Sequence, residues 1–179
     1  MQKTKIQDHI FNPAYECLSR SEMQNLQSER LRKTVERVYN NCAPYRKKMD
    51  ELKLKPSDVK SVSDLYKLPF TVKHDLREAY PFGFYSSPAE DIVEVHASSG
   101  TTGKLTVVGY SRNDLEVWSE IVARGLSMAG VTKDSMVHVA YGYGLFTGGL
   151  GAHYGAQKIG ASTVPASAGN TIRQLTLLR

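Results

Sequence analysis

Residues 98–104 read Ser98-Ser99-Gly100-Thr101-Thr102-Gly103-Lys104, a run of four hydroxyl side chains, two glycines and one lysine. This composition suits a phosphate chain. Glycines let backbone N–H groups converge on the oxygens, hydroxyls donate further hydrogen bonds, and the ammonium adds a charge-assisted contact. A flexible polar loop without a ligand is the alternative interpretation. Flexible polar loops are common, but seven such residues in a row between two apolar strands are rarer. The sequence therefore predicts a phosphate-binding loop.

The segments on either side of this loop predict two strands. Residues 91–96 alternate loosely in polarity, and residues 105–110 resume β-type composition after the loop. A Walker A loop needs Gly, four residues and then Gly-Lys-Ser/Thr before a helix. Counted back from Gly103, its first position holds Ser98 and its last holds Leu105, so that motif is excluded. The sequence predicts a strand–loop–strand site instead.

Two further glycine pairs fail the dinucleotide fingerprint, which requires a third glycine three residues after the second. That position holds Thr147 after Gly144 and Tyr154 after Gly151. The dinucleotide-binding fold is therefore excluded as well.

The second half of the chain alternates strands and helices. Its elements are expected at residues 91–96, 105–110, 111–129, 135–140, 147–159, 162–165 and 171–178. In the first helix of this series Leu115, Trp118, Val122 and Leu126 share one face, which makes Trp118 a core anchor, and Gly130 follows as the helix stop. The fold class predicted is α/β.

The first half is expected to be mainly helical, because Gly83 is its only glycine. Apolar residues at helical spacing predict a helix over 23–42 that ends near Pro44. A short helical turn is expected over 63–68, and a helix over 71–79 with Thr71 as its cap.

Composition narrows the class of protein. The chain has 179 residues, of which 41% are hydrophobic, so disorder is excluded as the main state. The net charge is +5, with acidic residues interleaved among the basic ones, which indicates solvated helix faces and no nucleic-acid partner. Two cysteines form no disulfide scaffold, and we see no apolar run of membrane-spanning length or secretory signal. We expect a cytoplasmic protein without a membrane partner.

A second candidate site is the aromatic and glycine-rich run over 141–146. It follows the expected strand 135–140, at whose carboxyl end ligands bind in open α/β sheets. Tyr141 and Phe146 offer flat surfaces to a ring, or they pack into the core, and the residues alone leave both readings open. His96, His138 and His153 show no metal-ligand spacing, so no metal site is expected, and His138 is expected to be a hydrogen-bonded core residue.

Longer stretches resemble the phenylacetate–CoA ligase family of adenylate-forming enzymes (acyl-CoA synthetases). The matching segments are His96–Lys104, Thr106–Tyr110, Tyr141–Ala156, Leu68-Pro69-Phe70-Thr71 and Tyr80-Pro81-Phe82-Gly83. One departure is Leu105, where the family usually carries proline, so the loop gains backbone freedom. The resemblance implies a helical segment over 1–90, followed over 91–179 by the beginning of the AMP-binding α/β sheet of the same domain.

The resemblance also implies an activity. Such enzymes activate an aryl acetate with ATP and Mg²⁺ to an acyl-adenylate and transfer it to coenzyme A. By this resemblance, Ser98, Ser99, Gly100, Thr101, Thr102, Gly103 and Lys104 hold the β- and γ-phosphates, and Tyr141 and Phe146 line the aryl pocket. The family's catalytic lysine has no counterpart here, so no catalytic residue is assigned in this chain.

The chain is expected to be an N-terminal portion of such a ligase, inactive alone, whose open sheet edge favours a homodimer. A stand-alone nucleotide-binding or interaction protein derived from a ligase is the alternative. The aryl acid is also left open among phenylacetate, indoleacetate and a hydroxylated ring.

Overall fold

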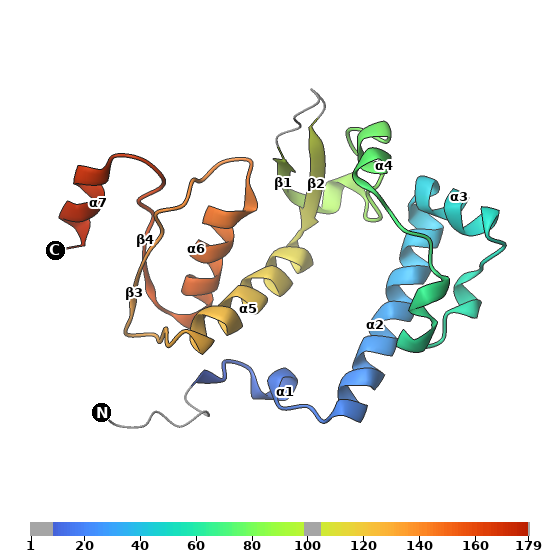
Figure 1. The fold of residues 1–179 in the computed structure, drawn as a ribbon, viewed down its shortest axis with the longest axis horizontal. Helices are drawn as coiled ribbons and strands as arrows, with labels where there is room; N and C mark the ends of the chain where they lie inside the picture. The colour runs from blue at the N-terminus through green and yellow to red at the C-terminus, as the bar shows by residue number, and fades with distance from the viewer. Residues whose placement is uncertain (1–8, 99–104, 179) are drawn as a thin grey trace. The chain divides into compact units, whose positions relative to one another are not determined.

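The structure is a computed structural model that describes residues 9–98 and 105–178. It divides into two compact units (Figure 1). One comprises Cys17–Ser111 and is called the hairpin unit here; the other comprises Met1–Glu16 with Arg112–Arg179 and is called the crossover unit. The division into a helical segment over 1–90 and an α/β segment over 91–179 stays a prediction. The two compact units divide the chain elsewhere, because they group the first pair of strands with the helices that precede it.

The hairpin unit consists of helices followed by two strands. Its helices are α2 (Arg20–Asn41), α3 (Ala43–Glu51), η2 (Pro56–Asp58), η3 (Val62–Lys67), α4 (Lys73–Glu78) and η4 (Ala89–Asp91). Val35, Met49, Leu54 and Val59 form its buried core, where α2 and α3 meet the following turns. The first half is therefore mainly helical, as its lack of glycine predicts.

Two details differ from the expectation. Pro44 does not simply end the first helix but lies in the first turn of α3, where a missing N–H costs no hydrogen bond. Thr71 does not cap α4. The N-cap is Val72, whose backbone N–H donates to the Asp75 carboxylate over 2.8 Å. Asp75 inside the first turn thus bonds to the N-cap residue, whereas the side-chain cap that we expected from a hydroxyl is not formed.

Strands β1 (Ile92–Ser98) and β2 (Thr106–Ser111) form the expected pair around the loop. They are antiparallel, with His96 opposite Val108 and Ser98 opposite Thr106. The strand–loop–strand expectation is confirmed for both strands, which frame residues 99–104.

The crossover unit contains a parallel strand pair joined by a helix. Its elements are α1 (Pro13–Glu16), α5 (Arg112–Met128), β3 (Met136–His138), α6 (Thr147–Ile159), β4 (Ser162–Val164) and α7 (Thr171–Leu177). Gly130 adopts φ +92° just beyond α5, the left-handed conformation expected of a helix stop. The strand expected over 135–140 is shorter, since β3 covers only Met136–His138, and it is less buried than expected, since Met136 is 71% exposed.

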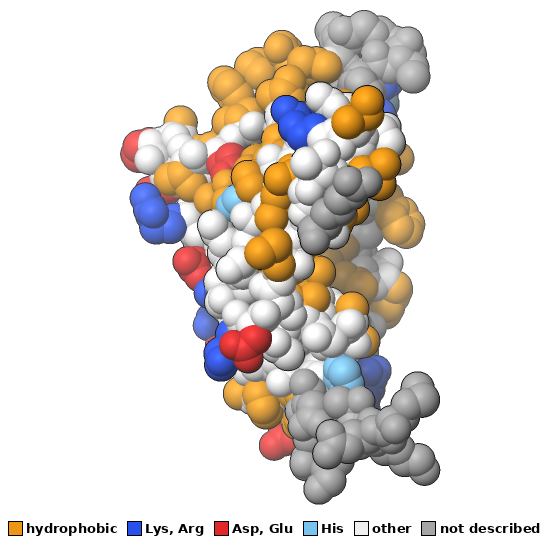
Figure 2. Space-filling model, turned by 90° about the vertical axis from the view of Figure 1, so that its left-hand side faces the viewer, with side chains coloured by type: hydrophobic (Ala, Val, Ile, Leu, Met, Phe, Trp, Pro, Cys, Tyr) orange, Lys and Arg blue, Asp and Glu red, His pale blue; other side chains and the backbone are white. Residues whose placement is uncertain are grey.

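The α/β class is confirmed, but the described strands form two separate two-stranded sheets. The face shown in Figure 2 carries many exposed hydrophobic side chains. Among the described residues, no helix is both long and apolar enough to cross a membrane.

Candidate functional site

The ends of β1 and β2 define the predicted phosphate site. Ser98 is exposed at the end of β1, directly across from Thr106 at the start of β2. The other predicted phosphate-binding residues, Ser99, Gly100, Thr101, Thr102, Gly103 and Lys104, lie outside the described residues. Leu105 begins the described part after the loop and is 38% exposed. The structure therefore fixes the strands on either side of the predicted loop.

A polar pair lies next to this loop on the face of β1 that also carries Ser98. Side chains alternate along a strand, so Glu94, His96 and Ser98 share one face. The His96 ring is 2% exposed, and its Nε2 lies 2.5 Å from a Glu94 carboxylate oxygen. Its ring also meets the Tyr110 ring edge-to-face, with centroids 5.3 Å apart. This pair is not among the residues predicted from the sequence, although its two-residue spacing on an expected strand was an available signal.

Tyr141 and Phe146 border the loop between β3 and α6, and both are accessible. Tyr141 is 63% exposed, and Phe146, the N-cap residue of α6, is 53% exposed. Within the described residues neither ring is buried in a core. Their part in a ligand site stays a prediction.

Glycines at the start of α6 bring this loop close to the helix. A Cβ on Gly148 would lie 2.5 Å from a carbon of the Tyr141 ring, and one on Gly149 would lie 2.6 Å from the Gly142 carbonyl oxygen. Real Cβ atoms do not approach other atoms so closely, so a side chain at Gly149 would displace backbone, and one at Gly148 would displace the Tyr141 ring. The missing Cβ of Gly148 thus makes room for that ring.

One side-chain hydrogen bond joins the same loop to the middle of α6. The Tyr143 hydroxyl lies 3.1 Å from Nδ1 of His153, and the two rings meet edge-to-face with centroids 5.9 Å apart. Burial raises the pKa of Tyr143 above its ordinary value. His153 was not predicted to belong to this site. The sequence feature that could have pointed to it is its position four residues after Gly149, which places both residues on the same face of α6.

His138 is half-buried, and its Nε2 makes the expected hydrogen bond, to the side-chain oxygen of Gln174 in α7. Within residues 9–98 and 105–178, no group of three His, Cys, Asp or Glu side chains could hold a metal ion.

The hairpin unit has a separate concavity of about 570 Å³ between α3 and α4. It is lined by both signs of charge, among them Lys48 and Asp75, whose charged atoms are 2.6 Å apart. The Lys48 ammonium lowers the pKa of Asp75, and it also donates to the Phe70 carbonyl over 3.1 Å. These contacts hold the start of α4 against α3 and neutralise the charges of Lys48 and Asp75 against each other.

No family model matches the chain. Among individual proteins, it is 52% identical to phenylacetate-coenzyme A ligase of Escherichia coli over 164 residues, which are 92% of this chain and 38% of that enzyme. The corresponding Aromatoleum evansii enzyme is also 52% identical, over 92% of this chain and 37% of its own length. The Thermus thermophilus enzyme is 49% identical over 95% of this chain and 38% of its own length.

Solved structures agree with the sequence comparison. An open conformation of 2-hydroxyisobutyryl-CoA ligase, in complex with 2-HIB-AMP and CoA, matches 98% of this chain and 42% of its own with a TM-score of 0.87 and 28% identity. The same ligase in its thioesterification state matches with a TM-score of 0.88 and 29% identity, over 98% of this chain and 39% of its own. The chain is therefore homologous, over nearly all of its length, to a part of the phenylacetate-coenzyme A ligases that spans about 38% of them.

Proposed function

We propose that this chain contributes the triphosphate-binding loop and one wall of the acid-binding site to an ATP-dependent phenylacetate–CoA ligase. The observation that carries the proposal is the identity of 52% with a phenylacetate-coenzyme A ligase over 92% of the chain. The predicted loop between β1 and β2 and the accessible rings of Tyr141 and Phe146 support it.

The proposed reaction has two steps. A phenylacetate carboxylate oxygen attacks the α-phosphorus of ATP. The bond between the α-phosphorus and the oxygen that bridges it to the β-phosphate breaks, and pyrophosphate leaves. The deprotonated thiol of coenzyme A then attacks the acyl carbon of the adenylate, and AMP leaves with the electron pair of the broken C–O bond. In the first step little covalent chemistry falls to the protein, so positioning and charge stabilisation account for most of its effect.

In this proposal Ser98 through Lys104 bind the β- and γ-phosphates. The backbone N–H groups and hydroxyls orient the pyrophosphate as it leaves, and the Lys104 ammonium offsets its developing charge. Tyr141 and Phe146 contact the phenyl ring and so direct the carboxylate toward the α-phosphorus.

Magnesium enters the proposal only as the ion that accompanies ATP. The described residues contain no group of three metal-ligating side chains, so none of them is assigned to hold it. Its contribution, when bound to the phosphates, is to neutralise part of their charge.

The 164 aligned residues span about 38% of the relative's length, so the rest of such an enzyme supplies the other walls of both sites. Adenine and ribose contacts and the catalytic lysine belong to that remainder in the proposal. We therefore propose that residues 1–179 by themselves make no thioester.

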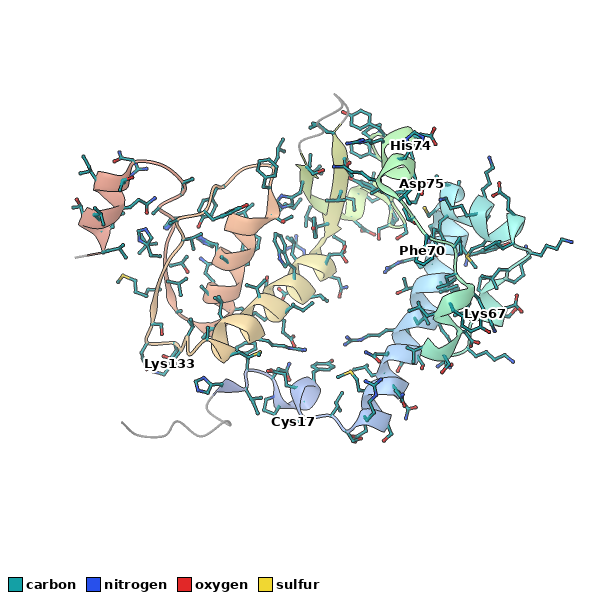
Figure 3. All side chains as sticks on the ribbon, viewed as in Figure 1. Cys17, Lys67, Phe70, His74, Asp75 and Lys133 are labelled. Carbon is teal, nitrogen blue, oxygen red and sulfur yellow. The ribbon has the colours of Figure 1, made fainter. Side chains whose placement is uncertain are left out.

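The test uses a chimera in which this chain replaces the aligned segment of the E. coli relative. Lys104→Ala in the chimera should raise the KM for ATP and lower kcat, with kcat/KM falling about 10- to 100-fold through loss of a charge-assisted contact. Lys133→Ala is the matched control, because Lys133 lies on the exposed turn between α5 and β3 and pairs with Asp134 (Figure 3). ATP kinetics equal in the two variants would remove Lys104 from the site.

A further inference from the structure

The loop that carries Tyr141 and Phe146 has three separate attachments to α6. The Tyr141 ring lies on Gly148, the Gly142 carbonyl lies on Gly149, and the Tyr143 hydroxyl reaches His153. The first two are contacts of shape, made possible by missing Cβ atoms. The third is a polar attachment, and of the three it lies farthest along the helix.

His153 is placed to act through the loop rather than on a ligand. It is half-buried, and its ring lies between Tyr143 and Tyr154, meeting both edge-to-face with centroids 5.9 and 6.1 Å away. Tyr154 in turn meets Trp118 of α5 edge-to-face at 5.8 Å. Packing of this kind fixes the orientation of the imidazole, so its Nδ1 offers a hydrogen-bond partner at a defined point.

We propose that His153 is a positioning residue, which accepts the Tyr143 hydroxyl and thereby holds the Tyr141–Phe146 loop in the conformation that presents both aromatic rings to the acid substrate. The effect of His153 on substrate binding rests on the proposed function, whereas its effect on the conformation of the loop does not. Loss of the bond frees the loop between its two ends, and the bound arrangement of the rings must then be selected from several conformations.

The loop is tested first in the 179-residue chain, without ligand. Tyr143→Phe and His153→Ala should each accelerate hydrogen exchange of the backbone amides in 141–146 by about three- to tenfold, the effect of one typical hydrogen bond. His153→Asn should restore slow exchange, because the asparagine side-chain oxygen can take the place of Nδ1. Tyr66→Phe is the control, since that tyrosine is 82% exposed.

The substrate is tested in the chimera with the E. coli relative, by the KM for phenylacetate. Tyr143→Phe and His153→Ala should each raise this KM about three- to tenfold, the double variant should raise it no further than either single one, and His153→Asn should resemble the parent chimera. Unchanged exchange in Tyr143→Phe, or a His153→Asn variant that behaves like His153→Ala, overturns the positioning role. Faster exchange in Tyr143→Phe and His153→Ala, together with a folded chimera that shows no phenylacetate-dependent turnover, keeps the positioning role and counts against the proposed function instead.

Discussion

Glycines in α5 and α6 occupy two kinds of position, and the difference is measurable. A Cβ on Gly155 of α6 would lie 2.5 Å from Val122 of α5, and one on Gly151 would lie 2.7 Å from the Trp118 ring. A Cβ on Gly125 of α5 would meet nothing within 4 Å. The first two glycines allow the helices to approach closely, whereas the third leaves an open surface.

We therefore expect opposite effects from the same substitution. Gly155→Ala should lower the free energy of unfolding by about 1–3 kcal/mol, because the methyl group must displace Val122 or the backbone behind it. Gly125→Ala should raise it by about 0.5–1 kcal/mol, because alanine in a helix interior is less costly in entropy than glycine. Urea unfolding of both variants checks this, and equal effects would contradict the close packing of α5 and α6.

Phe146 allows a second test at a single residue. In the chimera, Phe146→Ala should raise the KM for phenylacetate about tenfold and leave the KM for ATP unchanged, because the phenyl ring loses a packing partner on one side. The residue makes no side-chain capping bond to α6, so the helix should tolerate the change. Phe70→Ala is the control, since that ring is 90% exposed on the loop before α4 (Figure 3). Equal losses for both substrates would indicate damage to the fold instead.

Carboxylates fix the beginnings of several helical elements. The Glu22 carboxylate accepts from the backbone N–H of Ser19 before α2, over 2.8 Å. The Asp64 carboxylate accepts from the N–H groups of Lys60 and Ser61 before η3, and it pairs with Lys67 at 2.7 Å. These contacts hold the pKa of Asp64 at about 2, with the Lys67 ammonium as the largest cause.

This lowered pKa predicts a pH dependence of stability. Because the pKa of Asp64 is lower in the folded chain than its ordinary value of about 3.9, its contribution is present above that value. The contribution is lost as the pH falls through about 2, where the folded carboxylate takes up its proton. Asp64→Asn and Lys67→Gln should each flatten the fall in urea midpoint between about pH 5 and pH 2. A fall as steep in both variants as in the parent would contradict the assignment.

Most of the longer helices could be predicted from the sequence, and there are physical reasons why the other elements and side-chain pairs could not. Periodic apolar residues and glycine stops located α2, α5, α6 and α7 to within a few residues. Helix α3 was missed because Pro44 was read as a stop, although proline also fits the first turn of a new helix. The Tyr143–His153 and Glu94–His96 pairs were missed because each needs two elements, or two positions on one face, to be placed together first.

At the scale of the whole molecule, the described strands leave apolar surface uncovered. Sheets of two strands are marginal alone, and parallel strands are normally covered on both faces. In the crossover unit, Met136 on β3 is 71% exposed, and on α7 Ile172 and Leu175 are 80% and 58% exposed. In a ligase of the relatives' length, we expect further chain to cover these residues.

Residues 1–179 alone should therefore self-associate as concentration rises, because apolar surface and open strand edges favour contact between copies. Ile172→Glu combined with Leu175→Glu should reduce that association. Sedimentation velocity over a concentration series measures both. A chain that stays monomeric throughout would show that this surface is tolerated in water.

We propose that this chain supplies part of a phenylacetate–CoA ligase, including its triphosphate loop and one wall of its acid site. The most direct measurement is phenylacetate- and CoA-dependent pyrophosphate release by the chimera with the E. coli relative, beside residues 1–179 alone at equal concentration. We predict turnover by the chimera within about tenfold of the E. coli enzyme, a difference of about 1.4 kcal/mol in barrier, and none by the chain alone. A chimera that is folded and binds ATP but releases no pyrophosphate with phenylacetate would contradict the claim.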